Sequence, residues 1–187
     1  MSASKRDELI DKALAVFYRD GFHATGMDKL VAETGISKTS MYKHFRTKEE
    51  LILAALQIRS EKFCSWLSRR TEELAETPHD RLLALFDALD ELLQQKDFKS
   101  CVFIKAASEY PDSGHPIHDF SAQHKRLLLG YVHGLAEQAG APDPDRLARQ
   151  LLLLTEGAIV TAHLHGPVGV AADASAAAGC LIDAQLG

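Results

Sequence analysis

Cysteine and long apolar runs are both scarce in this chain of 187 residues. The three cysteines, Cys64, Cys101 and Cys180, stand far apart, and no two of them form a C-x-x-C pair. This spacing favours neither a disulfide framework nor a zinc ribbon, and it is typical of a reducing cytoplasm. After Lys5 the N-terminus lacks the apolar segment of a signal peptide, and no apolar run approaches the roughly 18 residues of a membrane span. We therefore expect a cytoplasmic protein that does not enter a membrane.

The chain also lacks the short motifs of common enzymes. It contains no G-x-S-x-G, no H-E-x-x-H and no glycine-rich phosphate loop, so we predict no catalytic residue and no cofactor. The enzymatic alternative is a metal-assisted hydrolase that would use His115, His118 and His124 with Glu109 as its base. The spacing of these histidines matches no standard zinc site, and we expect no bound metal.

Positive charge is not in excess, because the net charge of the chain is −5. The charge is nevertheless unevenly distributed. Residues 1–50 hold nine basic and eight acidic side chains, whereas residues 51–187 hold twelve basic and eighteen acidic ones. A net charge of +1 at one end and −6 over the remainder predicts an end that binds a polyanion and a body with another task.

Twenty-four residues beginning at Thr25 read TGMDKLVAETGISKTSMYKHFRTK and have the pattern of two short helices joined by a tight turn. Thr25, with Asp28 three residues later, is expected to cap the first helix. Gly35 is expected to end that helix in the left-handed conformation. Ser37 is a suitable N-cap for the second helix, which extends to about His44.

The second of these helices has one apolar and one polar face. Met41 and Phe45 are expected to turn toward the core, because they lie four residues apart. The outward positions are Lys38, Thr39, Tyr42 and Lys43. The segment 38–48 contains four fixed positive charges and no carboxylate, which suits a phosphate backbone. The pattern predicts a helix-turn-helix that contacts DNA.

The stretch GFHATGMDKLVAETGISKTSMYKHFRTKEEL resembles, nearly position for position, the N-terminal signature of TetR-type repressors. The resemblance implies an all-α fold, with a three-helix helix-turn-helix domain over residues 1–48 and an all-helical ligand-binding and dimerisation domain over residues 49–187. It also implies a homodimer that binds a palindromic DNA operator and is released by a small-molecule effector. The alternative is a constitutive DNA-binding module without a ligand. The residues that we assign to the DNA interface are Thr25, Ser37, Lys38, Thr39, Ser40, Tyr42, Lys43, His44 and Lys48.

Capping signals and apolar periodicity divide the whole chain into helices. Ser4 is expected to open the first helix, which ends before Gly21. Thr47 with Glu50 forms a capping box that opens a long helix reaching about Arg70. Further helices are predicted over residues 78–95, 101–110, 117–140, from 144 onward, and over 171–186. The last two are expected to pair with a second copy of the chain in a four-helix bundle.

Apolar and aromatic side chains with a few polar groups are the usual lining of a small-molecule site. The resemblance implies such a site in the residues that follow the helix-turn-helix, chiefly because the family has its ligand-binding domain there. The side chains that we assign to this effector site are Trp66, Phe86, Leu89, Phe103, Tyr110, Phe120 and His124.

Overall fold

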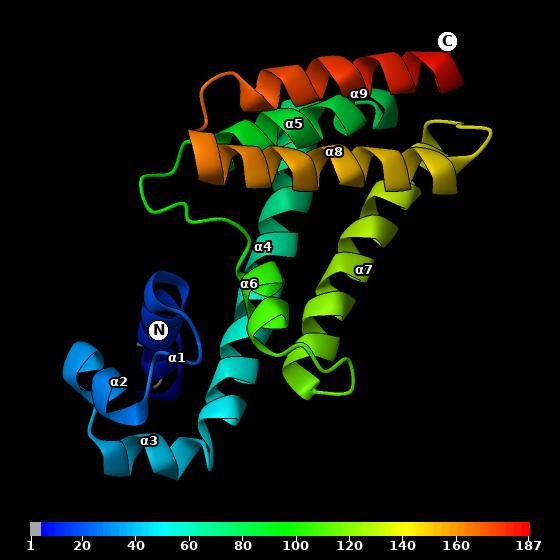
Figure 1. Ribbon diagram of the computed structural model, residues 1–187. Helices are drawn as coiled ribbons and strands as arrows, with labels where there is room; N and C mark the ends of the chain where they lie inside the picture. Colours follow the sequence, from blue (N-terminus) through cyan, green and yellow to red (C-terminus); the bar gives the residue numbers. More distant parts are fainter. Residues whose placement is uncertain (1–4) are drawn as a thin grey trace. The chain divides into compact units, whose positions relative to one another are not determined.

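The computed structural model describes residues 5–187, which form nine α-helices and no strand (Figure 1). The helices are α1 (Lys5–Asp20), α2 (Met27–Thr34), α3 (Lys38–His44), α4 (Lys48–Leu74), α5 (Pro78–Leu93), α6 (Val102–Glu109), α7 (Pro116–Gln138), α8 (Pro144–His165) and α9 (Val170–Leu186). The predicted all-α fold with an N-terminal helix-turn-helix is confirmed. Ser4, the predicted start signal of the first helix, lies outside the described residues. Within residues 5–187 no helix has a stretch long and apolar enough to cross a bilayer.

The chain divides into two compact units that are each discontinuous in sequence. The first unit contains residues up to Lys62 together with Cys101–His124, and the second contains Phe63–Ser100 together with Lys125–Gly187. Helix α6 and the start of α7 therefore share a unit with the helix-turn-helix. The prediction that the DNA-binding domain ends at Lys48 concerns function, not compactness, and it stays a prediction.

The first unit is built around one apolar cluster to which α1 contributes a complete face. Leu9, Ile10, Ala13 and Phe17 are all fully buried, as their helical spacing predicts. Phe22 follows α1 and stacks on Phe17 with 5.4 Å between the ring centroids. Burying a side chain of this size stabilises a fold by about 1.5–3 kcal/mol. This cluster also receives α3, the start of α4 and α6.

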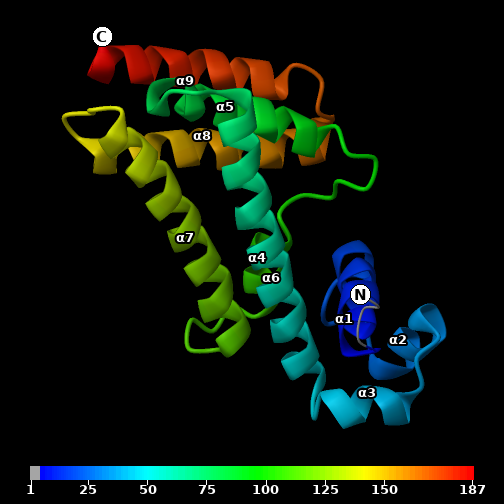
Figure 2. The same ribbon diagram turned by 180° about the vertical axis from the view of Figure 1, so that it is seen from behind.

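In the second unit, α9 packs against both α5 and α8 (Figures 1 and 2). The buried face of α9 consists mainly of small residues, including Ala174 and Ala178, which let the helix axes approach closely. Thr77 caps α5 by accepting a hydrogen bond from the Asp80 N–H at 3.1 Å. Asp143 caps α8 by accepting one from the Arg146 N–H at 3.0 Å. Both caps are followed by proline, which suits the first turn of a helix.

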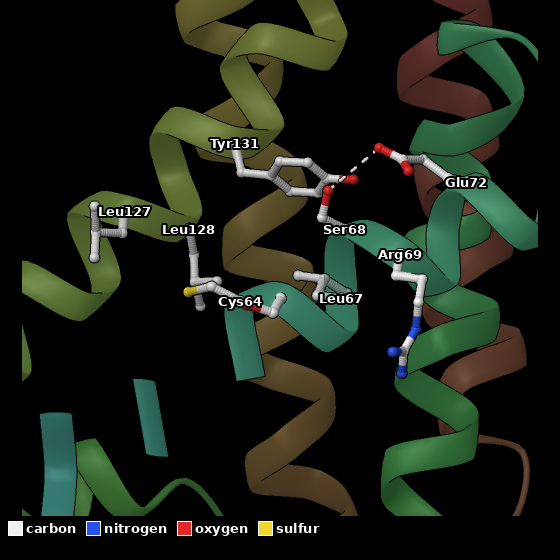
Figure 3. Close-up of a pocket in the computed structure, with 9 residues that line it drawn as sticks. Cys64, Leu67, Ser68, Arg69, Glu72, Leu127, Leu128 and Tyr131 are labelled. Carbon is white, nitrogen blue, oxygen red and sulfur yellow. Dashed lines mark hydrogen bonds between the residues drawn. The ribbon is translucent and has the colours of Figure 1, made fainter. Parts of the chain in front are cut away.

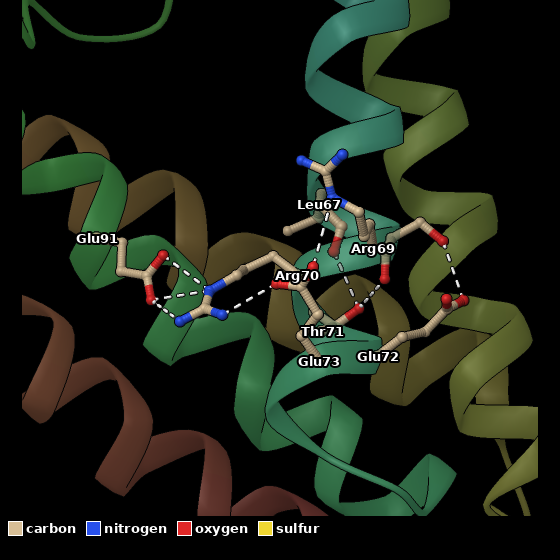
Figure 4. Close-up of polar contacts among 8 residues, drawn as sticks. Leu67, Arg69, Arg70, Thr71, Glu72, Glu73 and Glu91 are labelled. Carbon is tan, nitrogen blue, oxygen red and sulfur yellow. Dashed lines mark hydrogen bonds and ion pairs between the residues drawn. The ribbon is translucent and has the colours of Figure 1, made fainter.

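Helix α4 extends to Leu74, one turn beyond its predicted end near Arg70. The Arg70 guanidinium lies within this last turn and bonds to Glu91 of α5 at 2.6 Å and to Glu73 at 3.0 Å (Figure 4). The Thr71 hydroxyl donates back to the carbonyl of Leu67 at 3.0 Å. Hydrogen bonding by Arg70 holds the pKa of Glu91 below its ordinary value. The prediction was wrong because it followed the apolar periodicity, which ends near Arg70, whereas the polar residues after Arg70 continue the helix to Leu74.

Candidate nucleic-acid interface

A buried hydrogen bond closes the turn between α1 and α2, residues 21–26. Gly21 has a φ of +93°, which glycine adopts without strain. Thr25 is fully buried, and its hydroxyl donates to the Gly21 carbonyl at 2.7 Å. The N-cap of α2 is Gly26, so the prediction that Thr25 caps this helix was wrong. Its side chain closes the preceding turn and leaves no exposed surface for DNA.

The turn between α2 and α3 has the predicted chemistry. Gly35 adopts a left-handed φ of +70°, and its N–H donates to the Val31 carbonyl at 3.0 Å. Ser37 is the N-cap of α3, and its hydroxyl accepts a hydrogen bond from the Ser40 N–H at 3.2 Å. Both predicted roles are confirmed. The turn thus fixes the direction in which α3 leaves α2.

Helix α3 presents a buried and an exposed face as the sequence predicts. Met41 is fully buried and Phe45 is 5% exposed, so the two residues anchor the helix in the core of the first unit. Ser40 and Lys48 are half-buried. The exposed side chains of the segment predicted to contact DNA are Ser37, Lys38, Thr39, Tyr42, Lys43 and His44.

Lys38, one of the four positive charges in residues 38–48, pairs with a carboxylate that lies outside this segment. The Lys38 ammonium donates to the Asp28 carboxylate of α2 at 2.8 Å, and this hydrogen bond raises the pKa of Lys38. Asp28 lies ten residues earlier in the chain, so a count of charges over residues 38–48 overlooks it. Both side chains are exposed, and an exposed ion pair contributes little stability because water screens it.

The start of α4 adjoins this face. The Thr47 hydroxyl accepts a hydrogen bond from the Glu50 N–H at 3.1 Å, which confirms half of the capping box. The Glu50 carboxylate reaches the N–H of Arg46 at 2.7 Å, one residue before the cap. The Lys48 ammonium, predicted to bind phosphate, donates to the Phe22 carbonyl at 3.0 Å. Lys48 therefore also ties α4 to the turn between α1 and α2.

The histidines of the enzymatic alternative have separate partners. The Ile117 N–H donates to His115 at 3.2 Å, His118 Nδ1 donates to the Tyr110 carbonyl at 2.8 Å, and His124 Nδ1 lies 2.8 Å from the Ser60 hydroxyl. No group of three metal-ligating side chains with the geometry of a metal site occurs in the described part of the chain. Glu109, the base of that alternative, accepts hydrogen bonds from the N–H groups of Phe22 and His23 through its carboxylate.

The seven side chains predicted to line an effector site fall into both units. Phe103, Tyr110, Phe120 and His124 belong to the first unit, where the Phe103 and His124 rings stack with 3.6 Å between centroids. Trp66, Phe86 and Leu89 belong to the second unit. A common pocket for all seven stays a prediction.

The second unit has an open pocket of about 520 Å³ between α4 and α7 (Figure 3). Its lining contains none of the seven predicted residues and comprises Cys64, Ser65, Leu67, Ser68, Arg69, Glu72, Leu127, Leu128 and Tyr131. The Tyr131 hydroxyl bonds to Thr71 at 2.5 Å. Sequence periodicity identifies α4 and α7 as helices, but it does not reveal which of their residues leave a space between them.

Comparison with known proteins agrees with this geometry. A sequence profile described as "Bacterial regulatory proteins, tetR family" matches residues 9–55. A crystal structure of a TetR-type transcriptional regulator from Streptomyces avermitilis is 32% identical, has a TM-score of 0.84 and aligns over 98% of both chains. The chain belongs to the TetR family. It is therefore a DNA-binding transcriptional regulator, and the family resemblance predicted from residues 21–51 is confirmed.

Other relatives of this TetR-family regulator extend over most of its length. A TetR-family regulator from Streptomyces coelicolor is 26% identical, with a TM-score of 0.91 over 97% of this chain and 96% of the other. The HTH-type transcriptional regulator YjdC of Escherichia coli is 26% identical over 83% of this chain and 81% of its own. Further relatives are named as transcriptional repressors or as an activator. All of these names denote regulators of transcription.

Proposed function

We propose that the protein is a repressor that binds a palindromic operator in the cytoplasm as a homodimer and is released by a small-molecule effector. The observation that carries the proposal is the exposed face of α3. Met41 and Phe45 anchor this helix from behind, so its polar residues are held in a fixed array. In a two-fold dimer, two such helices would enter successive major grooves about 34–36 Å apart.

The residues of this face have separable tasks. Lys43, Tyr42 and Lys48 would contact phosphates and set the register, and Lys38 would join them when DNA displaces Asp28. Thr39, with Ser40 or Lys43, would read base edges. We assign the DNA-binding domain to residues 1–48 and the effector-binding and dimerisation domain to residues 49–187.

An exposed apolar stripe on α8 supports the homodimer. Leu153, Val160 and Leu164 are 71%, 50% and 66% exposed, and with the exposed Gly157 they repeat at intervals of four, three and four residues. This is the spacing of one face of a helix that packs against another helix. Exposed small residues of the neighbouring α9 are Ala172, Ala176, Ala177 and Ala184. Two such helices from each subunit would form a four-helix bundle.

Effector release requires only a modest difference in affinity. A ligand that prefers the non-binding arrangement of the dimer by about 2.8 kcal/mol would lower operator affinity a hundredfold. The pocket between α4 and α7 provides space of the size that small molecules occupy. We therefore add Leu128 and Tyr131 to the candidate effector contacts predicted from the sequence.

The proposal is tested by sequencing the DNA fragments that the purified protein retains from its own genome. The retained fragments should share a palindrome, and a mobility-shift assay should give one complex with it. Screening small molecules by thermal shift, and then for loss of that complex, separates an effector-released repressor from a constitutive module. If the protein binds the palindrome and no stabilising compound releases it, the result would support the constitutive alternative.

A further inference from the structure

The last turn of α6 holds the turn between α1 and α2 through a two-pronged hydrogen bond. The Glu109 carboxylate accepts the Phe22 N–H through Oε1 at 3.0 Å and the His23 N–H through Oε2 at 2.6 Å. In return, His23 Nε2 donates to the Glu109 carbonyl at 2.6 Å. Hydrogen bonds to an ionised carboxylate are roughly twice as strong as neutral ones. One side chain of α6 therefore fixes two consecutive backbone groups just before α2.

A lysine on the same face of α6 makes a second attachment. Lys105 lies four residues before Glu109, and its ammonium donates to the carbonyl of Tyr18 in the last turn of α1 at 3.0 Å. Lys48 holds the same region from α4, through the Phe22 carbonyl. The backbone that leads into the helix-turn-helix is thus attached at both ends by side chains from elsewhere in the first unit.

Three aromatic rings meet at the end of α6. The centroid of the Tyr110 ring lies 4.6 Å from that of His23, which is tilted against it, and 4.6 Å from that of His115, which stacks on it. His118 donates to the Tyr110 carbonyl, which ties the start of α7 to the same point. Tyr110 is only 7% exposed. Glu109 is therefore followed directly by a buried residue with several contacts of its own.

Gly21 lies directly beside the Glu109 carboxylate. A Cβ atom added to Gly21 would lie 3.0 Å from Glu109 Oε1, and the φ of Gly21 is +93°. Gly21 therefore serves two purposes, because it permits both the left-handed turn and the contact with the carboxylate. The Glu109 carboxylate would have to move by a few tenths of an ångström to admit a larger residue at position 21.

We propose that Glu109 is a positioning residue for operator recognition. It makes no contact with DNA in this proposal, and it acts by holding the turn between α1 and α2, and through that turn the direction of α2 and α3. The inference rests on the proposed function, because it needs a DNA sequence that the protein prefers. Correct placement of α3 matters for base contacts, whereas binding to an arbitrary duplex depends mainly on charge.

Two substitutions of opposite charge test the proposal. Glu109→Gln keeps the shape of the side chain, but it replaces one acceptor oxygen by an NH₂ group. That donor would face a backbone N–H, which is also a donor. Lys105→Met removes the other attachment of α6. The probes are a duplex selected by the wild-type protein from a random library and a scrambled duplex of the same length and composition. Glu61→Gln, which removes one charge from an exposed position of α4, is the matched control.

Charge alone predicts that Glu109→Gln strengthens binding to both duplexes and that Lys105→Met weakens binding to both. Positioning predicts instead that both substitutions lower the ratio of selected to scrambled affinity, by about tenfold for Glu109→Gln. Glu61→Gln should leave this ratio within about twofold of wild type. A ratio that stays unchanged in both α6 variants would overturn the assignment.

Loss of folding is distinguished by circular dichroism and by the scrambled duplex, because an unfolded protein loses affinity for both probes. If Glu109→Gln does not fold, the same ratio is measured for Lys105→Met and for His23→Phe. The second of these keeps an aromatic ring beside Tyr110 but removes the hydrogen bond from the His23 ring to the Glu109 carbonyl. A wild-type protein that selects no sequence would contradict the proposed function itself. A wild-type protein that selects one, with unaltered ratios in the variants, would contradict only the role of Glu109.

Discussion

Truncation of Leu164 on α8 should weaken the homodimer by a predictable amount. The side chain is 66% exposed in the single chain. Fully burying a leucine stabilises by about 1.5–3 kcal/mol, so covering the remaining two thirds contributes about 1–2 kcal/mol per copy. A two-fold interface contains two copies. Because alanine retains part of the side chain, Leu164→Ala should cost about 2–3 kcal/mol and raise the dimer dissociation constant about 30- to 150-fold.

Sedimentation velocity over a series of protein concentrations measures this dissociation constant. The matched control is Leu127→Ala, because Leu127 is a 52% exposed leucine on α7, outside the apolar stripe. The control should dimerise like the wild type, and circular dichroism should show equal helix content for all three proteins. A Leu164→Ala protein that dimerises as tightly as wild type, or a control that is equally weakened, would refute the assignment of the stripe.

Three further substitutions test individual residues. Lys48→Met should weaken binding to all duplexes about equally and lower the slope of log affinity against log salt by about one per subunit; thermal unfolding must accompany this assay because Lys48 also bonds to Phe22, and an unchanged slope would remove Lys48 from the interface. Thr39→Ala should relax base preference at one symmetric position of the selected sequence, and uniform weakening would show instead that Thr39 only positions. Tyr110→Phe should raise the free energy of unfolding by about 1 kcal/mol, because the buried hydroxyl has no hydrogen-bond partner within residues 5–187. Burial raises the pKa of Tyr110 to about 12. The unfolded tyrosine ionises near pH 10, before the folded one, so wild type loses stability as the pH rises from about 10 toward 12. Urea unfolding of both proteins across this range should therefore show a steeper loss for wild type, and parallel curves would contradict this cause.

Local signals in the sequence were sufficient for the helix boundaries that depend on neighbouring residues. Gly35, Ser37, Thr77 and Asp143 act within three or four residues of their own position, so their roles follow from spacing alone. The apolar face of α1 is equally local, because helical periodicity determines which of its side chains share a side. These features are also the ones that the structure reproduces.

Contacts between distant segments were beyond such reasoning. Thr25 is of a residue type that often caps helices, but its hydroxyl donates to the Gly21 carbonyl because the chain turns inward there. Glu109 lies 86 residues after His23 in the sequence, and no spacing rule connects them. The pocket between α4 and α7 likewise depends on which side chains fail to fill the space between two helices. Candidate effector residues chosen by residue type therefore do not coincide with it.

Sequencing of duplexes that the wild-type protein selects from a random library tests the central claim most directly. A two-fold dimer with one recognition helix per subunit should enrich a palindrome whose half-sites are centred about 10 base pairs, or a multiple of one helical turn, apart. Enrichment of a single asymmetric site, or of no sequence at all, would contradict the account of this protein as a dimeric, operator-specific repressor.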